Sequence, residues 1–259
     1  MDNKQRVVVR ISSDSLSFST IVDGEVVFEA YPLNASISMA ANLREAVKGK
    51  VQPANGLVVI DSPVMMIPVD LFLEEQKEEL YLHTFTKQEQ QAIMHYVLPD
   101  LNCVAVFSVR KDVLTVLRDT FTELTFMPAI VPVWRHLHQR SYTGQHQKLY
   151  AYFHERRVEV FAFAQNRFKF CNSFAANNPN DALYYMLAVW KQLAMAPDHD
   201  ELYLVGDMPE QDVLLEETKK FVKRVFYINP SGEFNRAPVT QIEGMPYDLM
   251  VLFVKGERL

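Results

Sequence analysis

The alternation of apolar and polar residues predicts a three-stranded antiparallel meander at residues 6–33. Residues 16–22 (LSFSTIV) place Leu16 and Phe18 on one face of a strand and Ser17 and Ser19 on the other. The dipeptide Asp23-Gly24 then separates two β-rich runs, which is typical of a two-residue hairpin turn. The chain is therefore expected to begin with three consecutive strands.

A helix and a buried strand are expected to follow this meander. Asn34 and Ser36 can cap a helix that continues to about residue 48. Residues 56–60 (GLVVI) form a short apolar run that ends at Asp61, and such runs are typical of a strand buried on both faces. The first part of the chain therefore has the predicted order β-β-β-α-β.

The same order of elements returns at residue 148. Three alternating segments are followed by a long helix, opened by Asn178 and Pro179, and then by a strand that ends at Gly206-Asp207. Residues 140–147 (RSYTGQHQ) are polar and lack apolar periodicity, so they are the predicted linker. We expect a first half over residues 1–140, with an extra subdomain at about 63–127, and a second half over residues 148–259.

This duplicated pattern resembles the actin-like ATPase fold, also called the duplicated ribonuclease-H-like fold. The resemblance rests on the order of elements and on the stretches VVVRISSDSLSFST, KLYAYFHERRVEVFAF and LYLVGDMP. The first stretch and the chain length are also similar to a bacterial family of unknown function assigned to that fold. The resemblance implies an α/β protein of two β-β-β-α-β-α halves with mixed sheets. It also implies that nucleotide binds between the halves, with two hairpins at the phosphates and a Gly-rich turn at the adenosine.

Three departures from the family's pattern predict a degenerate site. Arg10 stands where the family has an acidic residue that organises Mg²⁺ and water, and Ser12 replaces a glycine. The second hairpin, which reads YFHERR at residues 152–157, lacks the expected acid and glycines. Gly206-Asp207 stands where a Gly-Gly turn is expected. Because Mg²⁺ requires oxygen ligands and close approach to phosphate favours glycine, competent ATP hydrolysis is not expected.

Each candidate nucleotide-binding residue also has a structural interpretation. Ser12, Ser13, Asp14 and Ser15 could surround a phosphate, although serine and aspartate are common in hairpin turns. Asp61, Gly206 and Asp207 follow apolar strands, at the end where ligands bind in open α/β sheets, and they equally fit turns or helix caps. No residue is assigned as catalytic, and ATP with Mg²⁺ would be the cofactors of an active protein.

Composition and motifs exclude several other classes of function. The net charge of −6 comes with basic residues scattered along the chain, which disfavours nucleic acid as a partner. His136 and His138 are two residues apart and point to different faces of a helix, and no HExxH or CxxC motif is present, so no metal site is expected. The chain shows neither a signal-peptide pattern nor an apolar run of membrane-spanning length. With Cys103 and Cys171 its only cysteines, we expect a cytoplasmic protein with reduced thiols and no membrane insertion.

The sequence therefore predicts a non-catalytic or weakly nucleotide-binding module that acts through a protein partner. The alternative is an active Mg²⁺-dependent ATPase or kinase that uses Asp14, Asp61 or Asp207. A third interpretation is a scaffold without a ligand, in which side chains such as Arg10 and Arg156 fill the site. Neither the partner nor the oligomeric state follows from the sequence.

Overall fold

The computed structural model describes residues 6–48, 55–85, 90–144, 146–165 and 167–255. The chain divides into two compact units, which are described separately below. The first unit combines Met1–Val133 with Pro238–Leu259, and the second is Trp134–Ala237. This differs from the predicted division at residues 140–148, because the C-terminal segment belongs to the first unit and not to the second.

The first unit is built on a five-stranded mixed sheet with the order β3-β2-β1-β4-β8. The first three strands are antiparallel neighbours, while β4 and β8 run parallel to β1. The strands are β1 (Arg6–Ile11), β2 (Leu16–Val22), β3 (Glu25–Tyr31), β4 (Asn55–Ile60) and β8 (Glu123–Pro128). The turn at Asp23 and Gly24 has φ values of 52° and 84°, as the hairpin prediction requires.

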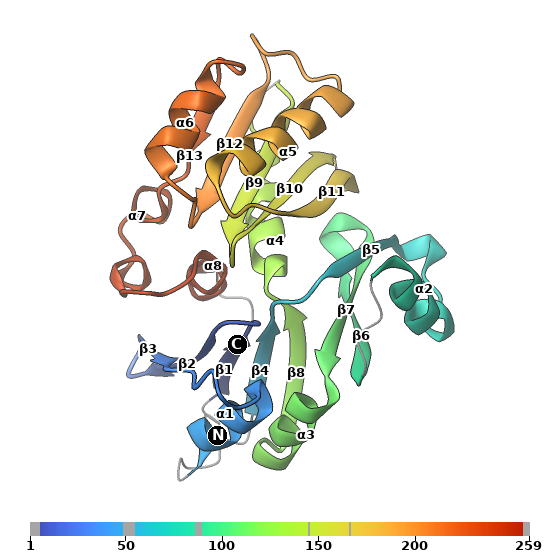
Figure 1. Cartoon of the computed structure of the whole chain (residues 1–259), viewed down its shortest axis with the longest axis vertical. Coiled ribbons are helices and arrows are strands. Elements are labelled where there is room, and N and C mark those ends of the chain that lie inside the picture. Colours follow the sequence, from blue (N-terminus) through green and yellow to red (C-terminus); the bar gives the residue numbers. More distant parts are fainter. Residues whose placement is uncertain (1–5, 49–54, 86–89, 145, 166, 256–259) are drawn as a thin grey trace. The chain divides into compact units, whose positions relative to one another are not determined.

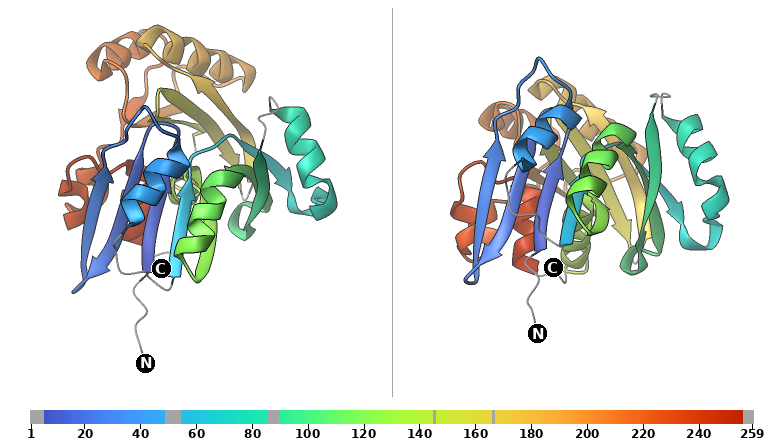
Figure 2. Two further views of the ribbon diagram at one scale, coloured as in Figure 1. Left: turned by 60° about the horizontal axis from the view of Figure 1, so that its bottom comes forward. Right: turned by 90° about the horizontal axis from the view of Figure 1, so that it is seen from below.

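Two helices cover one face of this sheet (Figures 1 and 2). They are α1 (Met39–Val47) and α3 (Lys111–Thr120), whose side chains Leu43 and Leu117 pack with Val9 and Ile11 of β1. The helix α1 begins later than predicted, because Ser38 caps it by accepting a hydrogen bond from the amide of Ala41. Burial of this apolar face is the main contribution to the stability of the unit.

An insertion between β4 and α3 carries a small sheet of its own, with the order β5-β7-β6. Its core contains Ile67, Tyr81, Val104 and Val106. Neither β5 nor β8 was predicted as a strand from the sequence. Because α3 packs on the main sheet and β8 is one of its strands, the extra subdomain is shorter than the predicted range of 63–127. Its elements are β5 (Val64–Pro68), η1 (Val69–Leu71), η2 (Glu74–Gln76), α2 (Lys77–Thr84), β6 (Gln91–Leu98), η3 (Pro99–Leu101) and β7 (Cys103–Arg110).

The second unit repeats the topology of the main sheet, with the order β11-β10-β9-β12-β13. Again three antiparallel strands are followed by two strands parallel to the first. Its strands and main helices are β9 (Lys148–His154), β10 (Arg157–Ala164), β11 (Arg167–Ala175), α5 (Pro179–Gln192), β12 (Glu201–Gly206), α6 (Gln211–Lys219) and β13 (Val225–Tyr227). The shared order and direction of strands confirm the predicted duplication.

The two faces of the second sheet differ in chemistry because the side chains of β9 alternate between them. Leu149, Ala151 and Phe153 belong to an apolar core with residues of α5. On the other face, Tyr150 stacks on Phe161 and on Tyr203. That second face is therefore aromatic, and the guanidinium of Arg140 lies over the ring of Tyr203.

The remaining helices are α4 (Ile130–Ser141), α7 (Pro230–Glu233), η4 (Pro238–Gln241) and α8 (Tyr247–Lys255). The helix α4 also includes Arg140 and Ser141, the first residues of the predicted linker. Gln145, in the middle of that linker, lies outside the described residues. None of the helices in the described ranges has the length and apolar character needed to cross a membrane.

A partly buried ionic network joins α4 to α7 within the second unit. The Glu233 carboxylate lies 2.9 Å from His136 Nε2 and accepts a hydrogen bond of 2.5 Å from Arg140 Nη1. Arg140 also lies over the ring of Tyr203, 5.1 Å from its centroid. The hydrogen bond from His136, together with that from Arg140, lowers the pKa of Glu233 to about 2.

Because of this network, we expect the free energy of unfolding to depend on pH in the acid range. The lowered pKa of Glu233 gives stability that is present above its ordinary pKa of 4.5 and is lost as the pH falls from there toward about 2. The variant Glu233→Gln should therefore have a free energy of unfolding that is lower by on the order of 3 kcal/mol at neutral pH. The difference from the natural chain should shrink below pH 4.5. Urea unfolding at a series of pH values measures this difference, with Glu216→Gln on an exposed site as the control. A difference that is the same at pH 3 and pH 7 would exclude the ionic role of Glu233.

Candidate functional site

The first candidate phosphate loop connects β1 to β2 and satisfies its own hydrogen bonds. Ser12 Oγ accepts hydrogen bonds from the amides of Asp14, at 3.2 Å, and Ser15, at 2.9 Å. The Ser12 amide in turn donates to the carbonyl of Ser15 at 3.0 Å, and the two serine hydroxyls are 2.8 Å apart. Three amides that could face a phosphate are thus occupied within the loop.

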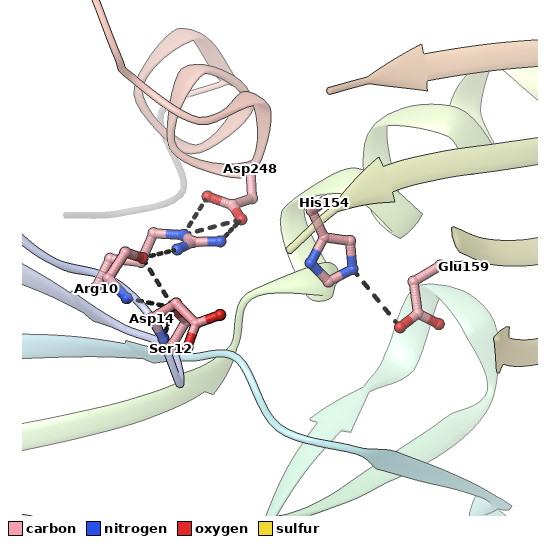
Figure 3. Close-up of polar contacts among 7 residues, drawn as sticks. Arg10, Ser12, Asp14, His154, Glu159 and Asp248 are labelled. Atoms are coloured by element: carbon pink, nitrogen blue, oxygen red, sulfur yellow. Dashed lines mark hydrogen bonds and ion pairs between the residues drawn. The ribbon is translucent and has the colours of Figure 1, made fainter. Parts of the chain in front are cut away.

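Arg10 lies at the end of β1 and forms a buried ion pair with Asp248 of α8. Arg10 Nε lies 3.0 and 3.1 Å from the two carboxylate oxygens, and Nη2 lies 2.9 Å from Oδ2. The two side chains are 3% and 0% exposed. Figure 3 shows the carboxylate of Asp248 facing the guanidinium from the helix above the strand. The remaining nitrogen, Nη1, donates to Ser15 Oγ at 3.0 Å, which links the ion pair to the loop.

The alternation of β1 explains why this arginine turns away from the helix-covered face. Val9 and Ile11 belong to the core under α1 and α3, so Arg10 projects from the opposite face. There it meets α8, which brings the C-terminal segment into the first unit. A buried guanidinium is stable only when paired, and Asp248 supplies both the charge and the bidentate geometry.

Asp61 lies at the same edge of the sheet as the Ser12 loop. The parallel register pairs Ile11 with Ile60, and the Asp61 amide donates to the Ile11 carbonyl at 2.9 Å. Asp61 is half-buried and Asp14 is exposed. The structure therefore brings together five of the seven predicted site residues, and both carboxylates are of the type that binds Mg²⁺.

The corresponding hairpin of the second unit is tight but contains no glycine. Glu155 and Arg156 form the turn between β9 and β10 with φ values of 46° and 58°, a region that disfavours large side chains. The preceding residue, His154, stacks on Tyr152 with ring centroids 4.6 Å apart and lies 3.6 Å from Glu159 (Figure 3). Large side chains thus stand where the resemblance implies a glycine-rich loop.

Gly206 and Asp207 occupy the end of β12 in the second unit. Gly206 has a φ of 96°, and a Cβ at this position would lie 2.1 Å from the carbonyl oxygen of Phe153. The Asp207 amide donates to that same oxygen at 2.9 Å. The glycine is thus required by the close approach of β12 to β9, which accounts for it without a nucleotide.

Sequence reasoning did not identify Asp248 as part of the candidate site. Its signal is a lone carboxylate in the apolar run PYDLMVLF. An acid in such a run is seldom buried without a partner, and Arg10 in the apolar run RVVVRI has the same property. No group of three or more histidine, cysteine, aspartate or glutamate side chains in the described ranges is arranged to hold a metal ion.

Comparison with known proteins identifies the family and the fold. The chain belongs to the family described as protein of unknown function (DUF3822), whose profile matches residues 1–225. It is similar to a crystal structure from Bacteroides thetaiotaomicron VPI-5482, described as a protein with actin-like ATPase fold and unknown function. That likeness has a TM-score of 0.82 at 28% identity and covers 96% of this chain and 95% of the other.

A second similar structure is that of the PilM-PilN type IV pilus biogenesis complex. It has a TM-score of 0.54 at 10% identity, and the likeness covers 96% of each chain. None of the curated proteins matches the sequence. The protein therefore has an actin-like ATPase fold, as the order of its elements predicts.

We expect the buried ion pair to matter far more for stability than an exposed one in the same unit. Asp248→Asn leaves the Arg10 guanidinium without its counter-charge, which should cost about 3–5 kcal/mol. The control is Asp112→Asn, which weakens the exposed pair with Arg110 and should cost less than about 1 kcal/mol. Hydrogen exchange of β1 peptides reports on the first unit directly.

A second variant separates charge pairing from packing at this position. Arg10→Met combined with Asp248→Leu removes both charges and should be more stable than Asp248→Asn alone. Equal protection of the β1 amides from hydrogen exchange in Asp248→Asn and Asp112→Asn would show that the buried pair is not important for the stability of the first unit.

We expect Gly206 to tolerate no side chain. Gly206→Ala places a methyl group against the Phe153 carbonyl oxygen and should destabilise the second unit by more than about 3 kcal/mol. Gly144→Ala is the control, because Gly144 has a φ of 77° with nothing within 4 Å of its Cβ position. It should cost about 1–2 kcal/mol from backbone strain alone. Tryptophan fluorescence during urea unfolding measures both variants, and equal effects would contradict the steric explanation.

Proposed function

We propose that this protein is a non-catalytic actin-like module that binds nucleotide weakly and acts through a protein partner. The observation that best supports the proposal is the loop at residues 12–15, whose serine hydroxyl already accepts hydrogen bonds from two loop amides. Phosphate binding by a hairpin depends on amides directed at the ligand. Here those amides must first leave Ser12, which weakens any phosphate affinity.

The ion pair at the end of β1 supports the same conclusion. The resemblance implies an acidic residue there for Mg²⁺ and water, but Arg10 is a cation and its nitrogens are bound to Asp248 and Ser15. Moving Arg10 to a phosphate would leave Asp248 charged and buried, at a cost of about 3–5 kcal/mol. That cost would raise the Kd of a phosphate bound through Arg10 by about two to four powers of ten, at about 1.4 kcal/mol per tenfold. Arg10 is therefore a structural group and not a phosphate ligand.

The second unit adds support from its hairpin and its strand end. Glu155 and Arg156 replace the small residues that allow a backbone to approach phosphate, and the Asp207 amide is bound to Phe153. The remaining alternative is an active Mg²⁺-dependent ATPase or kinase. Asp14, Asp61 and Asp207 are the carboxylates that could serve it, since each lies at a strand end.

Action through a partner is proposed because this fold supports protein assembly in a structural neighbour. PilM is described in a complex with PilN, and its likeness to this chain is one of fold. We also place the protein in the cytoplasm. Cys103 and Cys171 are free thiols, and burial raises the pKa of the Cys103 thiol to about 12, which fits an inert reduced cysteine.

We expect MgATP to give only a small thermal shift and no phosphate release. A ligand at about five times its Kd adds about 1 kcal/mol to the free energy of unfolding. If the Kd is in the millimolar range, the titration must therefore reach millimolar nucleotide for the shift to be detected. The measurement is a thermal-shift titration with MgATP and MgADP, together with a phosphate-release assay. Sodium chloride at matched ionic strength is the control.

Two outcomes distinguish the alternatives. Phosphate release that is abolished by Asp14→Ala, Asp61→Ala or Asp207→Ala would replace the proposal with the enzymatic alternative. Absence of any shift with nucleotide would remove the weak-binding part and favour a scaffold without a ligand.

A further inference from the structure

The inserted subdomain exposes several large apolar side chains within one short segment. Leu71 is 67% exposed, Leu73 46%, Val69 41% and Leu80 39%. All four lie between the start of η1 and the second turn of α2, and we call residues 69–80 the η1–α2 surface. This run accounts for four of the exposed large apolar residues in the described part of the chain.

The exposure of these residues is fixed by their buried neighbours. Phe72 packs against the small core and contacts the ring of His95 in a tilted arrangement, with ring centroids 5.0 Å apart. Tyr81 is buried, and its hydroxyl donates to the Pro63 carbonyl at 2.8 Å. With Phe72 and Tyr81 held inward, Leu71, Leu73 and Leu80 cannot turn into the core together.

Carboxylates surround the exposed apolar side chains. The segment contains five acidic residues and a single lysine, Lys77, whose Nζ lies 3.0 Å from Glu74. Of the other four acidic residues, three have no ion-pair partner within the described ranges: Asp70, Glu75 and Glu78. The acidic residues, all exposed, are Asp70, Glu74, Glu75, Glu78 and Glu79.

The spacing of these acids is unfavourable for the isolated chain. Glu75 and Glu79 are four residues apart and Glu75 and Glu78 are three apart, so like charges are neighbours on the surface. The start of α2 favours acids in its first turn, which accounts for Glu78 and Glu79. It does not account for Asp70, which precedes the helix by seven residues, or for the leucines beside it. A segment that breaks local rules without a compensating internal contact is a candidate for binding.

We propose that the η1–α2 surface binds a positively charged amphipathic segment of a partner protein. The apolar side chains of that segment cover Leu71, Leu73 and Leu80, and its lysines or arginines pair with Glu75, Glu78 and Asp70. This inference rests on the proposed function, of which it specifies the partner. The negative charge of the surface repels nucleic acids and anionic lipid surfaces, so a basic protein segment is the class that fits.

Two synthetic peptides test the proposal on the full chain. One is an 18-residue helix-forming peptide of leucine and lysine, and the other has the same leucine positions with glutamate in place of lysine. Isothermal titration at low salt should detect binding of the lysine peptide only. Its affinity should fall at least tenfold at about 0.5 M salt, because exposed charges are screened.

Variants of the surface identify where the peptide binds. Leu71→Ser with Leu73→Ser removes the exposed apolar contact, and Glu75→Gln with Glu78→Gln removes charge while keeping size. Each pair should weaken binding of the lysine peptide at least tenfold. The matched controls are Phe221→Ser and Glu216→Gln, exposed positions in the second unit that should leave the affinity unchanged. Hydrogen exchange with the peptide bound should protect residues 69–84.

Several results would overturn the proposal. They are failure of the lysine peptide to bind, equal binding to the natural chain and both surface variants, or protection confined to another segment. Binding of anionic phospholipid vesicles that is lost in Leu71→Ser with Leu73→Ser would assign the surface to a membrane instead. None of these results affects the nucleotide assays, so failure of this inference is distinguishable from failure of the proposed function.

Discussion

The first unit depends on one buried ion pair, between Arg10 of β1 and Asp248 of α8. It joins residues 238 positions apart in the sequence and brings the C-terminal helix back to the first strand. Both charges are removed from water, so each requires the other, and the pair specifies where α8 lies more than it adds net stability. Through Ser15 the same arginine holds the β1–β2 loop. The position of the loop and the position of the chain's end are therefore set by one guanidinium.

The two hairpins at equivalent places in the duplicated fold are closed in different ways. In the first unit, the hydroxyl of Ser12 accepts the hydrogen bonds of two loop amides that a bound phosphate would otherwise accept. In the second, Glu155 and Arg156 adopt left-handed backbone conformations in a two-residue turn. Both solutions keep the strands paired in register, and neither leaves a glycine for close approach of a ligand. The fold is thus maintained by strand pairing and core packing, whereas the loop chemistry is free to change.

The sequence predicted the β-β-β-α-β order of elements along both halves because the period-2 alternation and the turn at Asp23-Gly24 are local signals. It did not predict β8, whose residues Glu123–Pro128 carry a charge and a proline and become a strand only by pairing with β4. Asp14 was predicted to lie in a hairpin turn and Asp61 at the end of a strand, and the parallel register of β1 and β4 brings them to one edge. Asp248 could not be predicted as the partner of Arg10, because no local pattern joins positions so far apart. The assignment of Gly206 likewise required knowing how close Phe153 lies.

The inserted subdomain departs from the rest of the chain in how it uses charge. Elsewhere, acids that lie in apolar surroundings are paired, as Glu233 is with His136 and Arg140. In the η1–α2 surface the acids outnumber the bases and lie beside exposed leucines. The insertion lies between two elements of the main sheet, β4 and α3, and leaves the topology common to both units unchanged. Selection for folding alone would not retain exposed leucines among like charges, since replacing them with polar residues would improve solubility at no cost to the core. The insertion is therefore where this chain differs most from a plain duplicated fold, and binding of a partner gives a physical reason for that difference.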